Sequence, residues 1–294
     1  MALTVEDARR AFAEEIREVC DIRCDALIEG LAKIPREQFL GPGPWLVVKP
    51  FRGLPMGMRA AADPDESPYR TTPDADPRRV YHNVLIAIDP ERRLNNGQPT
   101  ALLSWIDSLE PKPGERVLHV GAGLGYYTAV IAEAVGPTGS VIAVEHDAGL
   151  AARAAAHLAP WPQVRVVAGD GSTFDGGAFD VGFVNCGASK LMPAWLDHVA
   201  PGGRLLVPLT AEMAGQDYGF TLLVRRDGER WPARFTGGVS IYPCAGARDD
   251  VSNAALIEMF KKAGVGKVRA LRRDAHERDE SCVLHADGYC LASS

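Results

Sequence analysis

Three glycines at alternate positions, Gly121, Gly123 and Gly125, mark the part of the sequence best suited to chemistry. They follow the mainly apolar run 117–120 and precede a helix-forming run at 126–135. Glycine is favoured in such a turn because it adopts unusual backbone angles and lets a ligand approach the bare backbone. A buried strand that turns sharply into a helix in this way is typical of a binding site for a nucleotide-like ligand.

The spacing of these glycines distinguishes between nucleotide ligands. A dinucleotide-binding turn places its third glycine three residues after the second, so that a pyrophosphate reaches the helix end. Here Gly125 comes two residues after Gly123, and the bulky Tyr126 occupies the dinucleotide position. The sequence therefore disfavours a nicotinamide-dependent dehydrogenase and favours a nucleoside cofactor.

Two acidic residues end the next two predicted strands. Glu145 lies 22 residues beyond Gly123, the distance at which a carboxylate accepts hydrogen bonds from ribose hydroxyls. Asp170 follows the third strand and is placed to accept a hydrogen bond from an adenine amino group. Either acid alone is as well explained as a helix cap or a solvated loop residue. Together with the glycine turn they predict a nucleoside site, whose expected contact residues are His119, Gly121, Ala122, Gly123, Gly125, Glu145, His146, Asp170, Gly171 and Asn185.

The elements that position these residues alternate between strand and helix. We predict strands at 117–120, 141–144, 164–168, 180–185 and 204–209, and helices at 126–135, 148–158 and 193–199. Parallel neighbours need long crossover connections, so this alternation predicts an α/β fold with a doubly wound, mostly parallel sheet. In such a sheet the ligand lies at the carboxyl ends of the strands, where the strand order reverses.

Segments on either side of this core complete the predicted organisation. Residues 1–80 are expected to form a helical segment, 5–34, and a long loop rich in Pro, Gly, Asp and Arg, 41–80, which is either a lid over the active site or a structural cover. Residues 81–215 form the predicted core. Residues 216–294 are expected to complete or extend the sheet with strands at 218–224, 268–272 and 281–291 around a helix at 253–263.

Composition excludes several classes of protein. A net charge of −6 and a pI near 5.7 disfavour a binder of nucleic acid. No run approaches the ~20 apolar residues of a membrane span, and the charged N-terminus does not resemble a signal peptide. The six cysteines are scattered without paired C-x-x-C motifs, so we predict no metal site and no disulfide framework. We therefore expect a cytoplasmic monomer that binds neither nucleic acid nor membrane.

Several segments together resemble a known family: 32–39, Asn96-Gly97-Gln98, 117–128, Gly169-Asp170-Gly171 and 185–209. Over about residues 25–210, the chain resembles the protein-L-isoaspartate O-methyltransferase family of class I methyltransferases. The resemblance implies a Rossmann-like fold, S-adenosylmethionine as cofactor, and methyl transfer to an isoaspartyl or aspartyl carboxylate of a peptide or protein. It also implies that Gln98, Thr100 and Asn185 flank the methyl acceptor.

The implied chemistry asks little of the protein. A carboxylate with a pKa near ~4 is ionised at neutral pH and needs no general base. The sulfonium methyl is already activated, so catalysis consists mainly of positioning and of excluding water. The absence of a His-Asp or Cys-His motif therefore does not count against this function.

The chain departs from the family pattern at two positions. Ala101 stands where the family has a serine that helps to hold the acceptor carboxylate, and Thr100 or Ser104 are the candidate substitutes. His119 stands where such methyltransferases usually have an acid, so it is either a cofactor contact or a packed side chain. Four readings stay open: repair of isoaspartyl damage, methylation of one dedicated acceptor such as an aspartate in a modified peptide, methylation of a small molecule, and a non-catalytic scaffold that binds the cofactor.

Overall fold

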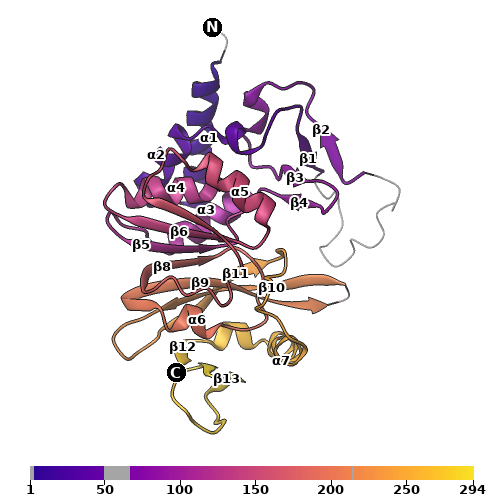
Figure 1. The fold of residues 1–294 in the computed structure, drawn as a ribbon. Coiled ribbons are helices and arrows are strands. Elements are labelled where there is room, and N and C mark those ends of the chain that lie inside the picture. The colour runs from indigo at the N-terminus through magenta and orange to yellow at the C-terminus, as the bar shows by residue number, and fades with distance from the viewer. Residues whose placement is uncertain (1–2, 50–66, 214) are drawn as a thin grey trace. The chain divides into compact units, whose positions relative to one another are not determined.

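The structure is a computed structural model that describes residues 3–49, 67–213 and 215–294 (Figure 1). The chain divides into two compact units, Met1–Ser104 and Trp105–Ser294. Helix α3 (Pro99–Ser108) spans the boundary between them. Among the described residues, no helix combines the length and the apolar character that a bilayer crossing requires.

Two helices open the first unit, within the segment 5–34 that the sequence predicted to be helical. Helix α1 (Val5–Cys20) begins with a capping box, in which the side chains of Thr4 and Asp7 each bind the other's backbone N–H. It ends at Asp21, which adopts a left-handed conformation with φ of 50°. Helix α2 (Asp25–Lys33) then starts anew. The segment is therefore helical over most of its length, with a break at 21–24 that the apolar spacing does not mark.

The rest of the first unit consists of short elements. These are the 3₁₀ helices η1 (Arg36–Phe39) and η3 (Pro77–Val80), and the paired strands β1 (Leu46–Val48) with β2 (Tyr69–Thr71) and β3 (Ala87–Asp89) with β4 (Leu94–Asn95). Arg36 is fully buried and donates hydrogen bonds to the carbonyls of Val80 and His82 at 2.6 and 2.9 Å. The predicted lid at 41–80 falls partly on residues 50–66, outside the described residues, so its role stays a prediction.

A seven-stranded sheet forms the second unit. Its strands are β5 (Arg116–Val120), β6 (Ser140–Glu145), β7 (Val164–Ala168), β8 (Phe179–Val184), β9 (Val199–Met213), β10 (Gln216–Arg225) and β11 (Ala233–Val239), in the order β11-β10-β9-β8-β5-β6-β7. Strands β5 to β9 pair in parallel, and β9, β10 and β11 form an antiparallel meander. The predicted doubly wound, mostly parallel sheet is confirmed.

Helices cover both faces of this sheet. Helices α4 (Tyr126–Val135) and α5 (Ala148–His157) lie on one side in Figure 1, and α6 (Pro193–Leu196) and α7 (Asp250–Lys261) on the other. One apolar core joins Trp195 of α6 and Leu256 of α7 to Leu205 and Leu222 of the sheet. The right-handed connections of parallel strands account for this arrangement, because the chain leaves β5 toward one face and β8 toward the other.

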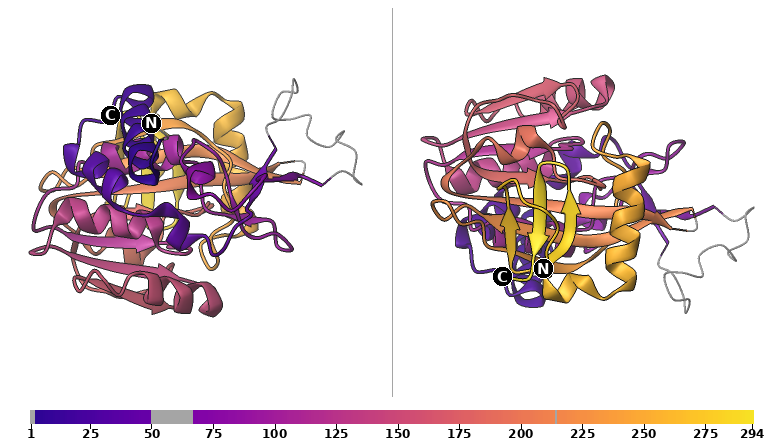
Figure 2. Two further views of the ribbon diagram at one scale, coloured as in Figure 1. Left: turned by 90° about the horizontal axis from the view of Figure 1, so that it is seen from above. Right: turned by 90° about the horizontal axis from the view of Figure 1, so that it is seen from below.

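The C-terminal residues form a second, smaller sheet. Its strands are β12 (Ala270–Arg272), β13 (Cys282–Ala286) and β14 (Tyr289–Ala292), in the order β12-β14-β13, and the 3₁₀ helix η4 (Gly264–Lys267) precedes them. Figure 2 shows the small sheet beside α7 in its right-hand view. The predicted strand over 281–291 is a hairpin because Gly288, with φ of 78°, turns the chain between β13 and β14.

Candidate active site

The glycine turn lies at the carboxyl end of β5, and the strand order reverses between β5 and its neighbour β8. Gly121, Gly123 and Gly125 have φ values of 80°, 57° and 91°, which side-chain-bearing residues rarely adopt. A Cβ at Gly121 would lie 3.0 Å from the Asn185 carbonyl, and one at Gly125 would lie 2.7 Å from Leu158. A Cβ at Gly123 would meet no atom within 4 Å. The outer glycines thus allow close packing, and the middle one faces open space.

The carboxylate of Glu145 holds this turn in place. Its Oε2 accepts a hydrogen bond from the Gly123 N–H at 2.7 Å, and its Oε1 accepts one from the Asp147 N–H at 3.0 Å. The residue is 8% exposed. Each carboxylate oxygen has two acceptor positions, so both keep capacity for a ligand hydroxyl. Glu145 therefore links the glycine turn to the end of β6 and stays able to bind.

The ends of β7 and β8 complete the edge. The Asn185 side chain donates to the Gly121 carbonyl at 3.2 Å, and its N–H donates to the Val120 carbonyl at 2.8 Å. Asp170 follows β7 and accepts from the Ser172 N–H at 2.8 Å. Gly171 has no room for a side chain, because a Cβ there would overlap Val120.

Cys186 follows Asn185 and lies within the electrostatic influence of both acids. A hydrogen bond with Cys244 and burial raise the pKa of the Cys186 thiol, and the charges of Glu145 and Asp170 raise it further. The thiol is therefore protonated at neutral pH. The arrangement gathers Glu145, Asp170 and Asn185 at one edge, as predicted, beside a thiol that is not activated as a nucleophile.

The two histidines assigned to the cofactor differ from the other predicted residues. His119 is fully buried, with its Nδ1 2.9 Å from the Thr128 hydroxyl and its ring stacked on Phe183. Burial lowers its pKa to about 3, so the ring is neutral. The structure favours the packed side chain over the cofactor contact, because β5 directs this ring into the layer between the sheet and α4. His146 is exposed next to Glu145.

Gln98 and Thr100, the predicted acceptor residues, belong to the first unit and stay a prediction. The Thr100 hydroxyl and N–H both lie 3.1 Å from the Asn83 side-chain oxygen. The Ser104 hydroxyl donates to the Thr100 carbonyl at 2.8 Å. Both candidate substitutes for the family's serine are therefore engaged inside their own unit.

One contributor to the edge was missed in the sequence. Gly246, in the segment before α7, approaches Asp170 and Ser172 so closely that a Cβ would overlap both side chains. Its φ of 76° requires glycine in any case. The small residues of Cys244-Ala245-Gly246-Ala247 are the signal of this close approach. Nothing in their spacing indicates which strand end they meet.

The residues at this edge fit a nucleoside cofactor. The open space at Gly123 leaves the backbone accessible. Glu145 offers unused acceptor positions, and Asp170 and Asn185 add polar groups on the neighbouring strand ends. Gly121, Gly123, Glu145 and Asp170 would hold the cofactor.

Comparisons with known proteins agree with this reading of the fold. A family model described as protein-L-isoaspartate(D-aspartate) O-methyltransferase matches residues 72–232. The protein-L-isoaspartate O-methyltransferase of Pyrobaculum neutrophilum is 37% identical over 80% of this chain and 98% of its own length. That of Methanothermobacter thermautotrophicus is 25% identical over 82% and 96%, respectively.

Solved structures show the same fold. A protein-L-isoaspartate O-methyltransferase matches with a TM-score of 0.63 and 20% identity, over 86% of this chain and 69% of that one. A putative one from Plasmodium falciparum, in complex with S-adenosyl-L-homocysteine, matches with a TM-score of 0.57 and 15% identity, over 80% and 97%. From the matched family model and these relatives, the chain belongs to the protein-L-isoaspartate O-methyltransferase family.

Proposed function

We propose that this chain transfers the methyl group of S-adenosylmethionine to an isoaspartyl or aspartyl carboxylate of a peptide or protein. The observation that carries the proposal is the glycine turn at the strand ends, within the region that matches the family. Glu145 binds the Gly123 N–H of this turn, and Gly123 faces open space. S-adenosylmethionine is the cofactor of this family, and when bound it supplies an activated methyl group.

The side chains beside the turn support a carboxylate acceptor over a phenol or alcohol. An ionised carboxylate needs no base, whereas a hydroxyl acceptor gains from a base that removes its proton. His119 is neutral because of its burial, but the same burial encloses its side chain fully. The Cys186 thiol is protonated. Neither group is suited to act as that base. Methylation of a small-molecule hydroxyl is therefore the weaker alternative.

A dedicated acceptor is the second candidate, and the hydrogen bonds of α3 favour it. The resemblance places Ala101 where a serine would help to hold an isoaspartyl carboxylate. Thr100 and Ser104 do not offer free hydroxyl donors in its stead, since the first binds Asn83 and the second donates to a helix carbonyl. This chain would then rely on other contacts, suited to one particular aspartyl peptide.

Radiolabelled S-adenosylmethionine with an isoaspartyl peptide and its aspartyl twin separates these possibilities. The readout is base-labile methyl ester, compared between the wild type and Ala101→Ser. Ester on the isoaspartyl peptide alone establishes repair activity. Ester on neither peptide from the wild type, with cofactor bound and with activity gained in Ala101→Ser, supports a dedicated acceptor. Tight cofactor binding without ester on any peptide or protein acceptor refutes methyl transfer and leaves the scaffold reading. A monomeric state and a cytoplasmic location are part of this proposal.

A further inference from the structure

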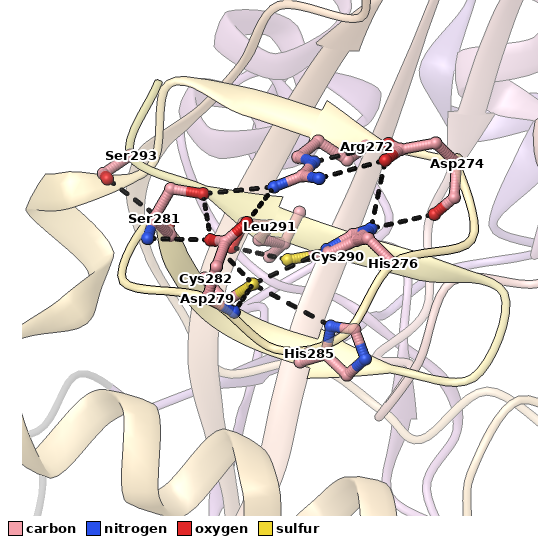
Figure 3. Close-up of polar contacts among 10 residues, drawn as sticks. All are labelled: Arg272, Asp274, His276, Asp279, Ser281, Cys282, His285, Cys290, Leu291 and Ser293. Carbon is pink, nitrogen blue, oxygen red and sulfur yellow. Dashed lines mark hydrogen bonds and ion pairs between the residues drawn. The ribbon is translucent and has the colours of Figure 1, made fainter.

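The C-terminal strands bring two cysteines and two histidines to one place, apart from the active-site edge. The ligand-capable side-chain atoms of His276, Cys282, His285 and Cys290 all lie within 4.8 Å of one another. Cys282 Sγ is 3.5 Å from His276 Nε2 and 3.9 Å from His285 Nδ1. Figure 3 shows these side chains pointing toward one another from β13, β14 and the loop before β13. We call these four residues the His/Cys cluster.

The strand pairing explains why three of these side chains meet. His285 and Cys290 are direct partners across β13 and β14, so their side chains share one face of the small sheet. Cys282 lies three residues before His285 and would point to the opposite face of a regular strand. The register shifts between Cys282 and Leu284. Such a bulge redirects a side chain, and here it brings the Cys282 sulfur beside His285.

The fourth side chain, that of His276, comes from a loop that has no large apolar residue to direct it inward. Residues 273–280 are mostly charged, and His276 is the one residue among them that is not exposed, with 12% of its side chain accessible. Its Nδ1 lies 2.9 Å from the Asp274 carbonyl and 3.2 Å from the Asp274 carboxylate. A proton on Nδ1, donated to Asp274, leaves Nε2 unprotonated toward Cys282. Metal-binding histidines are usually oriented by such an outer hydrogen bond.

The charged residues around the His/Cys cluster are bound to one another. Arg272 forms ion pairs with Asp274 at 3.0 Å and with Asp279 at 2.8 Å. The Asp279 N–H donates to Cys282 Sγ at 3.3 Å, and without metal the Cys282 thiol donates to the Asp279 carboxylate at 3.4 Å. The carboxylates therefore serve as partners of Arg272 and of the sulfur. The inward set consists of two nitrogens and two sulfurs.

We propose that His276, Cys282, His285 and Cys290 bind one Zn²⁺ ion that fixes the loop 273–281 to the small sheet. Two cysteines and two histidines are a common ligand set of tetrahedral structural zinc. Bond lengths of about 2.0–2.3 Å place neighbouring ligand atoms of a tetrahedron roughly 3.3–3.8 Å apart, close to the separations around Cys282. Binding converts two thiols to thiolates and releases two protons to solvent, and the two negative charges balance the ion.

The loop 273–281 has almost no apolar side chains with which to pack on the small sheet. The strands of this sheet contain three, five and four residues, and the loop 273–281 is almost wholly polar. A loop without large apolar side chains has little apolar surface to pack, so a metal or a disulfide is the kind of link that would order it. A Cys282–Cys290 disulfide is the competing explanation. It would account for the two sulfurs but not for the inward turn of both histidines.

The test measures metal in the full-length protein purified under reducing conditions without chelator. We expect about one zinc per chain by elemental analysis, and replacement by Co²⁺ with the visible absorption bands of a tetrahedral thiolate site. His285→Gln is the main variant, because His285 is exposed and its replacement should leave the chain folded. We expect it to weaken zinc binding at least about 100-fold in competition with a chromogenic chelator. Cys282→Ser removes one of the two thiolates and should reduce the thiolate-to-cobalt band by about half.

Cys20→Ser is the matched control, because Cys20 is a free cysteine of the first unit. It should keep its zinc and its cobalt spectrum. A thiol count separates zinc from the disulfide: all six cysteines should react after denaturation with chelator and without reductant, whereas a disulfide would leave four. Failure to retain Zn²⁺ after incubation with the ion and reductant would overturn the proposal. So would a count of four thiols, or wild-type zinc affinity in both His285→Gln and Cys282→Ser.

Discussion

Replacing Glu145 by glutamine tests the central contact of the active site. The carboxylate accepts two hydrogen bonds, from the Gly123 N–H at 2.7 Å and from the Asp147 N–H at 3.0 Å. A glutamine amide has one oxygen, so its NH₂ group must face one of these two donors. Glu145→Gln therefore loses one charge-assisted hydrogen bond and leaves a poorly accessible N–H without an acceptor.

The magnitude follows from these two contacts. A hydrogen bond to a charged group contributes about 1.5–3 kcal/mol, so the free energy of unfolding should fall by about that much. If the same carboxylate also binds the ribose of the cofactor, the affinity should fall by a similar free energy. At about 1.4 kcal/mol for each factor of ten, the Kd for the cofactor should rise by roughly 10- to 150-fold.

Urea denaturation of the cofactor-free protein and calorimetry with S-adenosyl-L-homocysteine measure the two effects. Glu133→Gln is the matched control, because Glu133 accepts from the Trp161 indole N–H at 2.7 Å and an amide oxygen can do the same. It should leave the Kd unchanged. A folded Glu145→Gln variant with wild-type Kd would refute the assignment of Glu145 to the cofactor, whatever its stability.

Three other perturbations address the turn and the pH dependence. Gly123→Leu should abolish cofactor binding in calorimetry, whereas Gly177→Leu, with φ of 75° and equal space, should retain it. A hydrogen bond from Lys190 lowers the pKa of Asp249 to about 2. The stabilisation from this exposed pair, at most about 1 kcal/mol, is therefore present above pH ~4 and lost toward pH 2. Asp249→Asn should reduce this loss of stability between about pH 4 and 2, as measured by urea denaturation. Burial lowers the pKa of His119 to about 3, so unfolded chains take up the proton first and stability falls below pH ~6.5; His119→Gln should reduce that slope.

The sequence predicted the α/β core well because residues at the ends of its helices and strands mark their boundaries locally. Helix α4 has the predicted bounds, since Gly125 and Gly136 define its two ends. Strand β7 also has the predicted bounds, 164–168, because turns flank its apolar run. Where no such marker exists, the prediction did not resolve separate elements. Asp21 breaks the first helix through its backbone conformation alone, and an apolar pattern does not record that.

Sites that depend on tertiary contacts were less accessible from the sequence. The glycine turn and Glu145 meet in the structure, as their spacing in the sequence predicted. His119 was assigned to the cofactor by its position beside the turn, although its side chain points into the core. The sequence analysis predicted no metal, because the proposed ligands at 276–290 lack a paired C-x-x-C motif. A bulge and a loop bring them together, and neither has a periodic pattern.

A single loop relates the C-terminal extension to the active-site edge. The loop begins at Asn185, which binds the glycine turn, and its Gly187 N–H donates to the Tyr242 carbonyl at 2.7 Å. Its far end, the Leu191 N–H, donates to the hydroxyl of Tyr289, the residue before Cys290, at 3.3 Å. The extension therefore contacts this loop near both of its ends. The conformation of the small sheet should thus affect the loop that borders the active-site edge.

The matched family region and the residues that follow it both contribute to this edge. The glycine turn, Glu145 and Asp170 lie within the matched region 72–232, whereas Tyr242, Gly246 and Tyr289 lie beyond it. The residues packed against the end of β8 and against Asp170 thus come from the C-terminal extension. Because Asn185 is a predicted acceptor residue and begins the loop that the extension holds, acceptor choice in this chain should depend on the extension.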